Sequence, residues 1–199
     1  MKEIHDTGTP NEESVDIRNP AERTCTWVFD RSESNYLRPW RDWRDSKDSG
    51  IMLLTGGIGT GKSTLALSAI DVLQNCPSPQ CRLVSASFCK DQAAYNSCEA
   101  ILRGLLYGIA RDDREARDIL VHHRDDSNHA KVGRNFNAFK SFDSLSYCFS
   151  KCVQIRKTEL CLVVDGLDEC EEISRRKLLS YITTLVEGVQ KMRHFVSAA

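Results

Sequence analysis

The sequence predicts an α/β fold with a parallel sheet, and three observations indicate it. Short apolar runs of strand length alternate with segments whose apolar residues recur every three or four positions. A glycine-rich stretch, GGIGTG at 56–61, separates the first such run from the first helical segment. A continuous apolar run, LCLVV at 160–164, is typical of a strand buried on both faces. Strands that alternate with helices pair in parallel, with helices on both faces, so three layers are expected.

Size and composition restrict the class of protein. A chain of 199 residues is long enough for one core. Hydrophobic residues make up 41% and charged residues 28%, which is typical of a packed, soluble domain. The formal net charge is −1, so no nucleic-acid partner is expected. No apolar run approaches the ~18 residues of a membrane span, which excludes that class.

The nine cysteines do not predict a disulfide framework, because their number is odd and no apolar secretory segment follows Met1. Reduced thiols and a cytoplasmic location are expected. No CxxC pair exists, so metal binding by cysteine is not favoured. Several cysteines instead lie in apolar patterns and are expected to pack as small hydrophobic residues: Cys25, Cys98, Cys148, Cys152 and Cys161.

The N-terminal segment divides into a leader and the start of the domain. Residues 1–19 are polar and aperiodic, which predicts a flexible leader, and the domain is expected to occupy 20–199. Arg23–Arg44 holds all three tryptophans and predicts short helical pieces that pack aromatic rings on the domain. A strand is expected at Ile51–Thr55, followed by the glycine stretch and a helix over Thr64–Leu73.

The remaining elements continue the alternation. Strands are expected at Arg82–Phe88, within Glu159–Asp165 and from His194 onward. Helices are expected around 98–109, 145–152 and 178–189 from their apolar spacing. Asp112–Ser141 is charged and aperiodic, so we expect a long surface excursion with one short helix at 116–121. His122, His123 and His129 are therefore predicted to lie in a solvated loop.

The glycine stretch fits the phosphate-binding (Walker A) pattern G-x-x-x-x-G-K-[ST], in the required position between a strand and a helix. Glycine lets the loop turn its N–H groups around a triphosphate, where a Cβ would block the turn. Lys62 is expected to reach the β and γ phosphates, and the Ser63 hydroxyl to ligate Mg²⁺. The predicted nucleotide-binding residues are Gly56, Gly57, Ile58, Gly59, Thr60, Gly61, Lys62, Ser63 and Thr64.

A phosphate loop needs an acidic element, and three acids follow the buried run. Asp165 is predicted to serve Mg²⁺ through water, and Asp168 with Glu169 to orient or deprotonate the attacking water. The alternative is that these acids only stabilise the start of the next helix. The combined motifs predict a three-layer P-loop NTPase fold with ATP or ADP and Mg²⁺ as cofactors.

The stretch CLVVDGLDEC at 161–170 resembles the acidic (Walker B) motif of NACHT domains, which belong to the STAND class of signalling NTPases. The upstream RTCTWVFDRSESNYLRPWRDW at 23–43 is similar to fungal-type members. The resemblance implies a nucleotide-controlled switch in signal transduction. It also implies protein partners or self-association, with slow Mg²⁺-dependent hydrolysis left open.

The same resemblance predicts a particular sheet. The strand that contains FVS at 195–197 is expected between the phosphate-loop strand and the Asp165 strand, which would bury Phe195 and Val196. Family members continue into a sensing arginine and a further strand, whereas this sequence ends at Ala199. A domain truncated after the Walker B region is therefore expected, with an open sheet edge beside Ile51–Thr55 and little or no hydrolysis by this fragment alone.

Two other functions stay open on the sequence. A small P-loop kinase would share the phosphate loop, although the spaced Asp168 and Glu169 favour activated water over an acceptor substrate and no arginine-rich lid is evident. A non-enzymatic remnant that only binds a protein partner is the third class. Nucleotide binding separates the remnant from the other two, and stimulation by a metabolite separates the kinase.

Overall fold

The computed structural model describes residues 29, 38–46, 48–75, 83–89, 92, 95–130, 139–156, 159–188 and 192–198. Four parallel strands form one sheet in the order β1-β4-β3-β2. They are β1 (Gly50–Thr55), β2 (Leu83–Phe88), β3 (Leu160–Asp165) and β4 (Met192–Ala198). The predicted α/β class and parallel sheet are confirmed. The predicted leader at 1–19 and Cys25 lie outside the described residues.

Strand β4 occupies the predicted position between β1 and β3. Val196 pairs with Leu53 on one side and with Val164 on the other. The predicted burial of Phe195 and Val196 concerns side chains outside the described part. In the described sheet β1 is an edge strand, as expected, and the side chain of Leu53 is 59% exposed.

The two faces of the sheet are read most clearly from β3, because all six of its residues are buried. Leu160, Leu162 and Val164 belong to one hydrophobic cluster, whereas Cys161 and Val163 belong to another. Successive side chains of a strand point to opposite faces, so the two clusters lie on opposite sides of the sheet.

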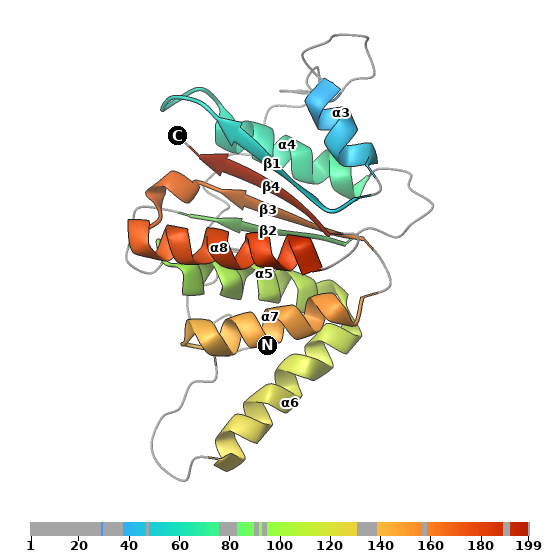
Figure 1. Cartoon of the computed structure of the whole chain (residues 1–199), viewed down its shortest axis with the longest axis vertical. Helices are drawn as coiled ribbons and strands as arrows, with labels where there is room; N and C mark the ends of the chain where they lie inside the picture. Colours follow the sequence, from blue (N-terminus) through green and yellow to red (C-terminus); the bar gives the residue numbers. More distant parts are fainter. Residues whose placement is uncertain are drawn as a thin grey trace.

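One face is covered by α4 (Lys62–Gln74), which buries Ala66, Ala69 and Leu73 against the Cys161 side of the sheet. The shorter α3 (Arg38–Asp45) adds Trp40 to the same cluster. The indole Nε1 of Trp43 donates to the carbonyl oxygen of Gly50 at 3.2 Å, which ties α3 to the start of β1. Figure 1 shows α3 and α4 together on this side of the sheet.

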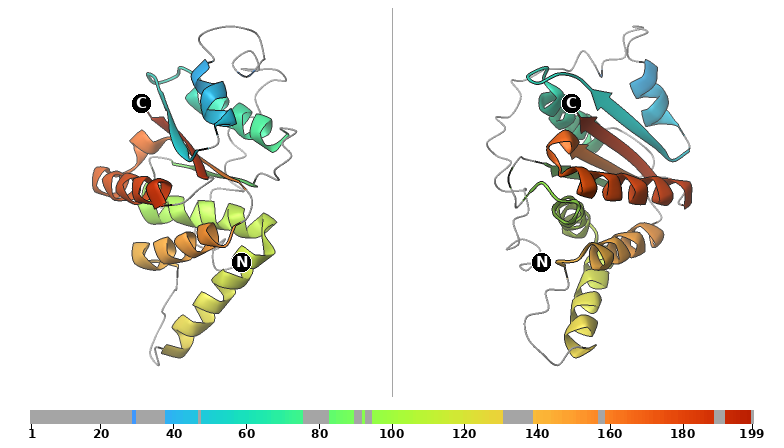
Figure 2. Two further views of the ribbon diagram at one scale, coloured as in Figure 1. Left: turned by 45° about the vertical axis from the view of Figure 1, so that its right-hand side comes forward. Right: turned by 60° about the vertical axis from the view of Figure 1, so that its left-hand side comes forward.

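The opposite face is covered by α5 (Cys98–Asp112) and α8 (Glu172–Gly188). Two further helices, α6 (Arg114–Ala130) and α7 (Phe142–Gln154), pack outside α5 (Figure 1). Figure 2 shows that α6 extends away from the body of the domain. Helices therefore cover both faces, and this three-layer arrangement is compatible with the predicted P-loop fold.

The predicted excursion at Asp112–Ser141 is wrong over its first half, because α6 is a helix of 17 residues. His122, His123 and His129 lie on this helix and not in a loop. The cause is tertiary packing. Ala116 and Leu120 are buried one turn apart, and Ile119 packs beside them, which is enough to dock a helix whose other positions are mostly polar.

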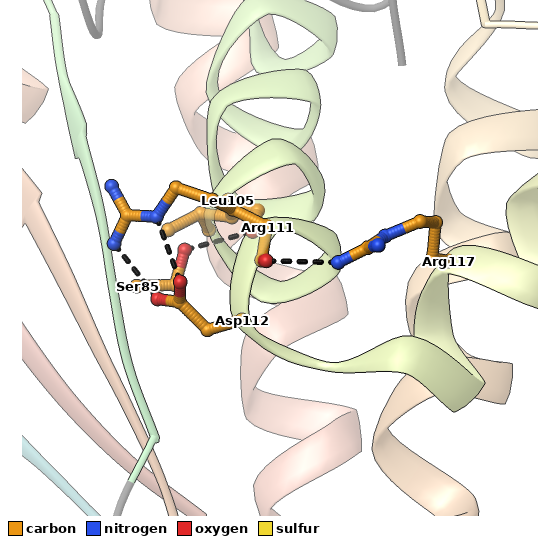
Figure 3. A network of polar contacts seen from close by, with 5 residues as sticks. All are labelled: Ser85, Leu105, Arg111, Asp112 and Arg117. Carbon is orange, nitrogen blue, oxygen red and sulfur yellow. Dashed lines mark hydrogen bonds and ion pairs between the residues drawn. The ribbon is translucent and has the colours of Figure 1, made fainter.

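The junction between α5 and α6 is held by side chains that cap helix ends. Arg117 donates from Nε to the carbonyl oxygen of Ala110 at 3.0 Å. A terminal nitrogen of Arg117 donates to the carbonyl oxygen of Arg111, also at 3.0 Å (Figure 3). These carbonyls belong to the last turn of α5, where no intrahelical donor exists. On the sheet side, Ser85 Oγ donates to the Leu105 carbonyl oxygen at 2.8 Å. Helix α5 is therefore fixed both to β2 and to α6.

We predict that Gly108→Ala destabilises the domain by about 1–3 kcal/mol, the usual cost of overpacking. A Cβ at Gly108 would lie 2.3 Å from Ser85 Oγ and 3.2 Å from Ser85 Cβ, so α5 would be pushed away from β2. Gly188→Ala is the matched control, because a Cβ there meets no atom within 4 Å. Urea unfolding measures both free energies, and equal stabilities for the two variants would contradict this account of the contact.

Six described cysteines are buried thiols, namely Cys89, Cys98, Cys148, Cys152, Cys161 and Cys170. Packing as small hydrophobic residues is thus confirmed for the four of them that were predicted. Burial raises the pKa of both Cys148 and Cys152 to about 12, which keeps these thiols protonated. Among the described residues, none of the helices has the length and apolar character that crossing a bilayer requires.

Candidate functional site

The glycine stretch forms a tight loop between β1 and α4. Gly59 and Gly61 have φ values of 76° and 85°, in the left-handed region that favours glycine. A Cβ at Gly56 would lie 2.9 Å from Thr60 Oγ1, so a larger residue there would displace the Thr60 side chain. Thr60 Oγ1 donates to the Gly57 carbonyl oxygen at 2.8 Å and closes the turn. The glycines therefore serve the curvature of the loop.

Lys62 folds back over this loop. Its Nζ donates to the carbonyl oxygens of Gly56 at 2.7 Å and Gly57 at 2.9 Å. Helix α4 begins at this residue, directly after Gly61, near which the sequence predicts its start, and its first intrahelical bond runs from Leu65 N to the Gly61 oxygen. The preceding N–H groups of the first turn have no intrahelical acceptor. An ammonium group and a helix N-terminus thus lie together, an arrangement that attracts anions.

Asp165 lies at the same end of the sheet as the loop. Continuing the register of β3 with β4 by one residue places it level with Ser197, whose partner on β1 is Leu54. With β4 between them, β1 and β3 are separated by two strand spacings, or about 10 Å. Figure 1 shows the loop after β1 and the turn after β3 at this end.

The side chain of Asp165 lies on the face that α4 covers. It follows the same alternation as Cys161 and Val163, which pack in the α4 cluster. The residue is only 4% exposed, so its carboxylate is held within the protein surface. Both features direct this carboxylate toward the side of the sheet on which Lys62 and Ser63 begin α4.

The turn after β3 is the short 3₁₀ helix η3 (Leu167–Glu169). It starts at Gly166, whose φ is 71° and whose Cβ would lie 2.9 Å from the Cys89 carbonyl oxygen. Cys89 N donates to the Asp165 carbonyl oxygen at 2.8 Å. The end of β2 therefore packs directly on this turn and fixes the backbone of Asp165.

The other two predicted acids lie on η3. Asp168 is half-buried, and its Oδ1 is buried without a hydrogen-bond partner among the described residues. A buried acceptor in this state favours a donor such as water or a metal-bound water. Glu169 is exposed, and its backbone N donates to the Gly166 oxygen at 2.9 Å. Both acids thus follow Asp165 within one turn.

The pKa of the Cys89 thiol reflects the negative charges at the end of the sheet where β3 ends. Burial raises the pKa of its thiol, and the charges of Cys170, Asp165, Glu169 and Asp168 raise it further. The three predicted acids therefore all act on the same thiol. Cys89 and Gly166 were not singled out in the sequence, although Cys89 follows the strand that neighbours β3.

Ser63 and Asp165 provide oxygen donors that suit a Mg²⁺ site shared with a phosphate ligand. Nowhere in the described part do three His, Cys, Asp or Glu side chains gather into a set that could hold an ion. Mg²⁺ commonly takes only one or two protein carboxylates and completes its shell with water and phosphate oxygens. Ser63 and Asp165 thus fit an ion shared with a phosphate ligand better than an ion enclosed by protein.

The comparison with protein families matches residues 23–198 to the family described as nephrocystin 3, N-terminal. The chain belongs to this family. No curated protein matches the chain. The matched region of this nephrocystin 3 N-terminal family member contains the glycine loop, Asp165, η3 and all four strands. The loop and the acids are therefore parts of one family region and not separate additions.

Proposed function

We propose that this nephrocystin 3 N-terminal region binds a magnesium nucleotide, ATP or ADP, at the Gly56–Thr64 loop. The observation that carries the proposal is the arrangement at one end of the sheet. A loop with two glycines in the left-handed conformation leads into a helix, and a lysine folds back over this loop. A buried aspartate lies two strands away on the same face of the sheet. A triphosphate with its ion spans a distance of this size.

Each group has a separate task in this proposal. The loop and the first turn of α4 supply N–H donors for the phosphates, and Lys62 exchanges its carbonyl contacts for the β and γ phosphate oxygens. The Ser63 hydroxyl and Asp165, the latter through water, hold Mg²⁺, which neutralises phosphate charge. Asp168 and Glu169 orient or deprotonate a water near the γ phosphate, so slow hydrolysis is the reaction that this site supports.

We further propose that the domain acts as the nucleotide-binding module of a NACHT-type signalling switch of the STAND class. The support is the acidic motif CLVVDGLDEC and the position of β4 between β1 and β3. In a switch, nucleotide state controls contact with protein partners or self-association. Such a module works in the cytoplasm, where ATP is available.

Calorimetric titration of the 199-residue chain with ATP, ADP and AMP, each with and without Mg²⁺, tests the proposal. ATP and ADP are expected to bind more tightly with Mg²⁺, and AMP much more weakly, because the loop recognises the β phosphate. Absence of binding by all three nucleotides would refute the proposal and favour a non-enzymatic interaction domain. Phosphate transfer accelerated by a metabolite acceptor would instead identify a small kinase.

A further inference from the structure

A groove of about 500 Å³ lies between α6 and α7, on the opposite side of the sheet from the glycine loop. Its volume is within the usual range for ligand pockets, roughly 300–1,000 Å³. The two helices run antiparallel, since the start of α6 contacts the end of α7 through Asp113 and Arg156. We call this surface the α6–α7 groove.

The groove is fixed at both ends by polar contacts. At one end the buried guanidinium of Arg156 pairs with Asp113, whose other carboxylate oxygen accepts from Ala116 N and caps α6. At the other end His123 Nε2 lies 2.6 Å from Ser144 Oγ. Helices held at two points keep their spacing, so a partner meets a groove that is already formed.

The shape of the groove follows the helix period. Tyr147 and Lys151 on α7 and Ile155 directly after it line the groove at intervals of four residues, and Glu115, Ile119 and His122 line it from α6. Residues at this spacing share one face of a helix. The groove therefore runs along the helices for about two turns, or about 12 Å. A long groove between antiparallel helices fits a third helix better than it fits a compact ligand.

The chemistry of the groove is asymmetric. Ile119, Tyr147 and Ile155 provide apolar surface, and Tyr147 is 53% exposed although it is a large ring. The α6 side carries the exposed acids Glu115 and Asp118. The α7 side carries Lys151, whose Nζ lies 5.6 Å from the centroid of the Tyr147 ring. Acid on one side and base on the other give an incoming helix a defined orientation.

We propose that the α6–α7 groove is a docking site for an amphipathic helix of a protein partner. The partner helix carries an apolar stripe that packs on Ile119, Tyr147 and Ile155, and lysine or arginine on the flank that faces α6. The basic flank is specified by Glu115 and Asp118. This inference does not depend on nucleotide binding, because the groove helices and α4, which follows the glycine loop, lie on opposite faces of the sheet.

The test is a displayed library of helical peptides of about 16 residues, long enough to retain helix. The peptides carry fixed leucines at positions i, i+4, i+7 and i+11 and random residues on both flanks, and they are selected on the folded 199-residue chain. The expected winners carry lysine or arginine on one flank only. Their affinity is expected to fall at least about tenfold for Asp118→Lys and for Tyr147→Ala, as for residues central to an interface.

Glu187→Lys is the matched control, since it makes the same charge change at an exposed position on α8, outside the groove, and should leave affinity unchanged. Circular dichroism confirms that each variant is folded before its affinity is compared. Failure to enrich any peptide, an acidic flank in the winners, or equal affinity for Asp118→Lys and the wild type would each overturn the proposal. Phenethylamine, an aromatic amine, serves as a small-molecule competitor for the groove. If it saturated the groove and the selected peptides did not compete with it, the peptides would bind elsewhere and the proposal would also be overturned.

Discussion

Replacing Lys62 with alanine should raise the dissociation constant for Mg²⁺-ATP by about tenfold to 150-fold. This corresponds to about 1.5–3 kcal/mol, the scale of a hydrogen bond to a charged group. The physical reason is that Nζ lies on the loop carbonyls of Gly56 and Gly57, within reach of any anion that the loop encloses. Calorimetric titration of the wild type and the variant measures the change.

Two controls separate loss of the ligand contact from loss of the loop. Lys140→Ala removes the same charge from an exposed position before α7 and should leave ATP affinity unchanged. Urea unfolding of Lys62→Ala reports what its two bonds to the loop contribute to stability. If Lys62→Ala bound ATP as tightly as the wild type, the phosphate role of this lysine would be wrong.

The second large effect is that Asp165 and Glu169 have different roles, one in Mg²⁺-dependent binding and the other in hydrolysis. Asp165→Asn should weaken the Mg²⁺-dependent part of ATP binding by about 10- to 100-fold, the scale of a group that orients a metal ligand. Glu169→Gln should preserve binding and slow phosphate release by about 10²- to 10⁴-fold, the scale of general base catalysis. Titration in Mg²⁺ and in EDTA measures the first change, and single-turnover phosphate release measures the second.

The alternative role of these acids makes a different prediction. If they only stabilise the start of α8, Asp165→Asn and Glu169→Gln will lower the melting temperature and leave the Mg²⁺ titration unchanged. Glu172→Gln is the reference for that outcome, because Glu172 is exposed in the first turn of α8 and pairs with Arg176. Loss of binding in Glu169→Gln together with an unaffected Asp165→Asn would show that the two roles are exchanged.

Much of the sheet could be predicted because its signals are local. The run at 160–164 has no polar residue, and the strand that contains it is buried at every position. The first strand was expected at Ile51–Thr55 and begins one residue earlier. The place of β4 between its neighbours does not follow from local signals. It was expected from the resemblance of the acidic motif to NACHT domains, and the strand order confirms it.

The short helix expected at 116–121 lies within α6, but the full length of α6 could not be predicted because its stability comes from residues far along the chain. Asp113 caps it while paired with Arg156, 43 positions later, and its buried residues Ala116 and Leu120 are too few to give a clear period. A charged stretch with so little apolar surface is also typical of a loop. Only the packing of α5 and α7 around it decides between the two structures.

The candidate site likewise has features that the sequence predicts and features that it does not. The pattern of Gly56, Gly61, Lys62 and Ser63 locates the loop directly from the sequence. The approach of Cys89 to Gly166 could not be predicted, because it depends on how closely the ends of β2 and β3 pack. The buried Oδ1 of Asp168 is a result of the same turn geometry, and no pattern in the sequence carries that information.

The position of β4 has a consequence for how the domain is made. Of the four described strands it is the last to leave the ribosome, yet in the sheet it lies between two earlier strands, β1 and β3. While the chain is being synthesised, β1 has no neighbour in the sheet, so the glycine loop and Asp165 cannot take up their final separation. Insertion of β4 should therefore join β1 to β3 and bring the parts of the candidate nucleotide site together in one step, and nascent chains that lack it should expose apolar strand edges to chaperones.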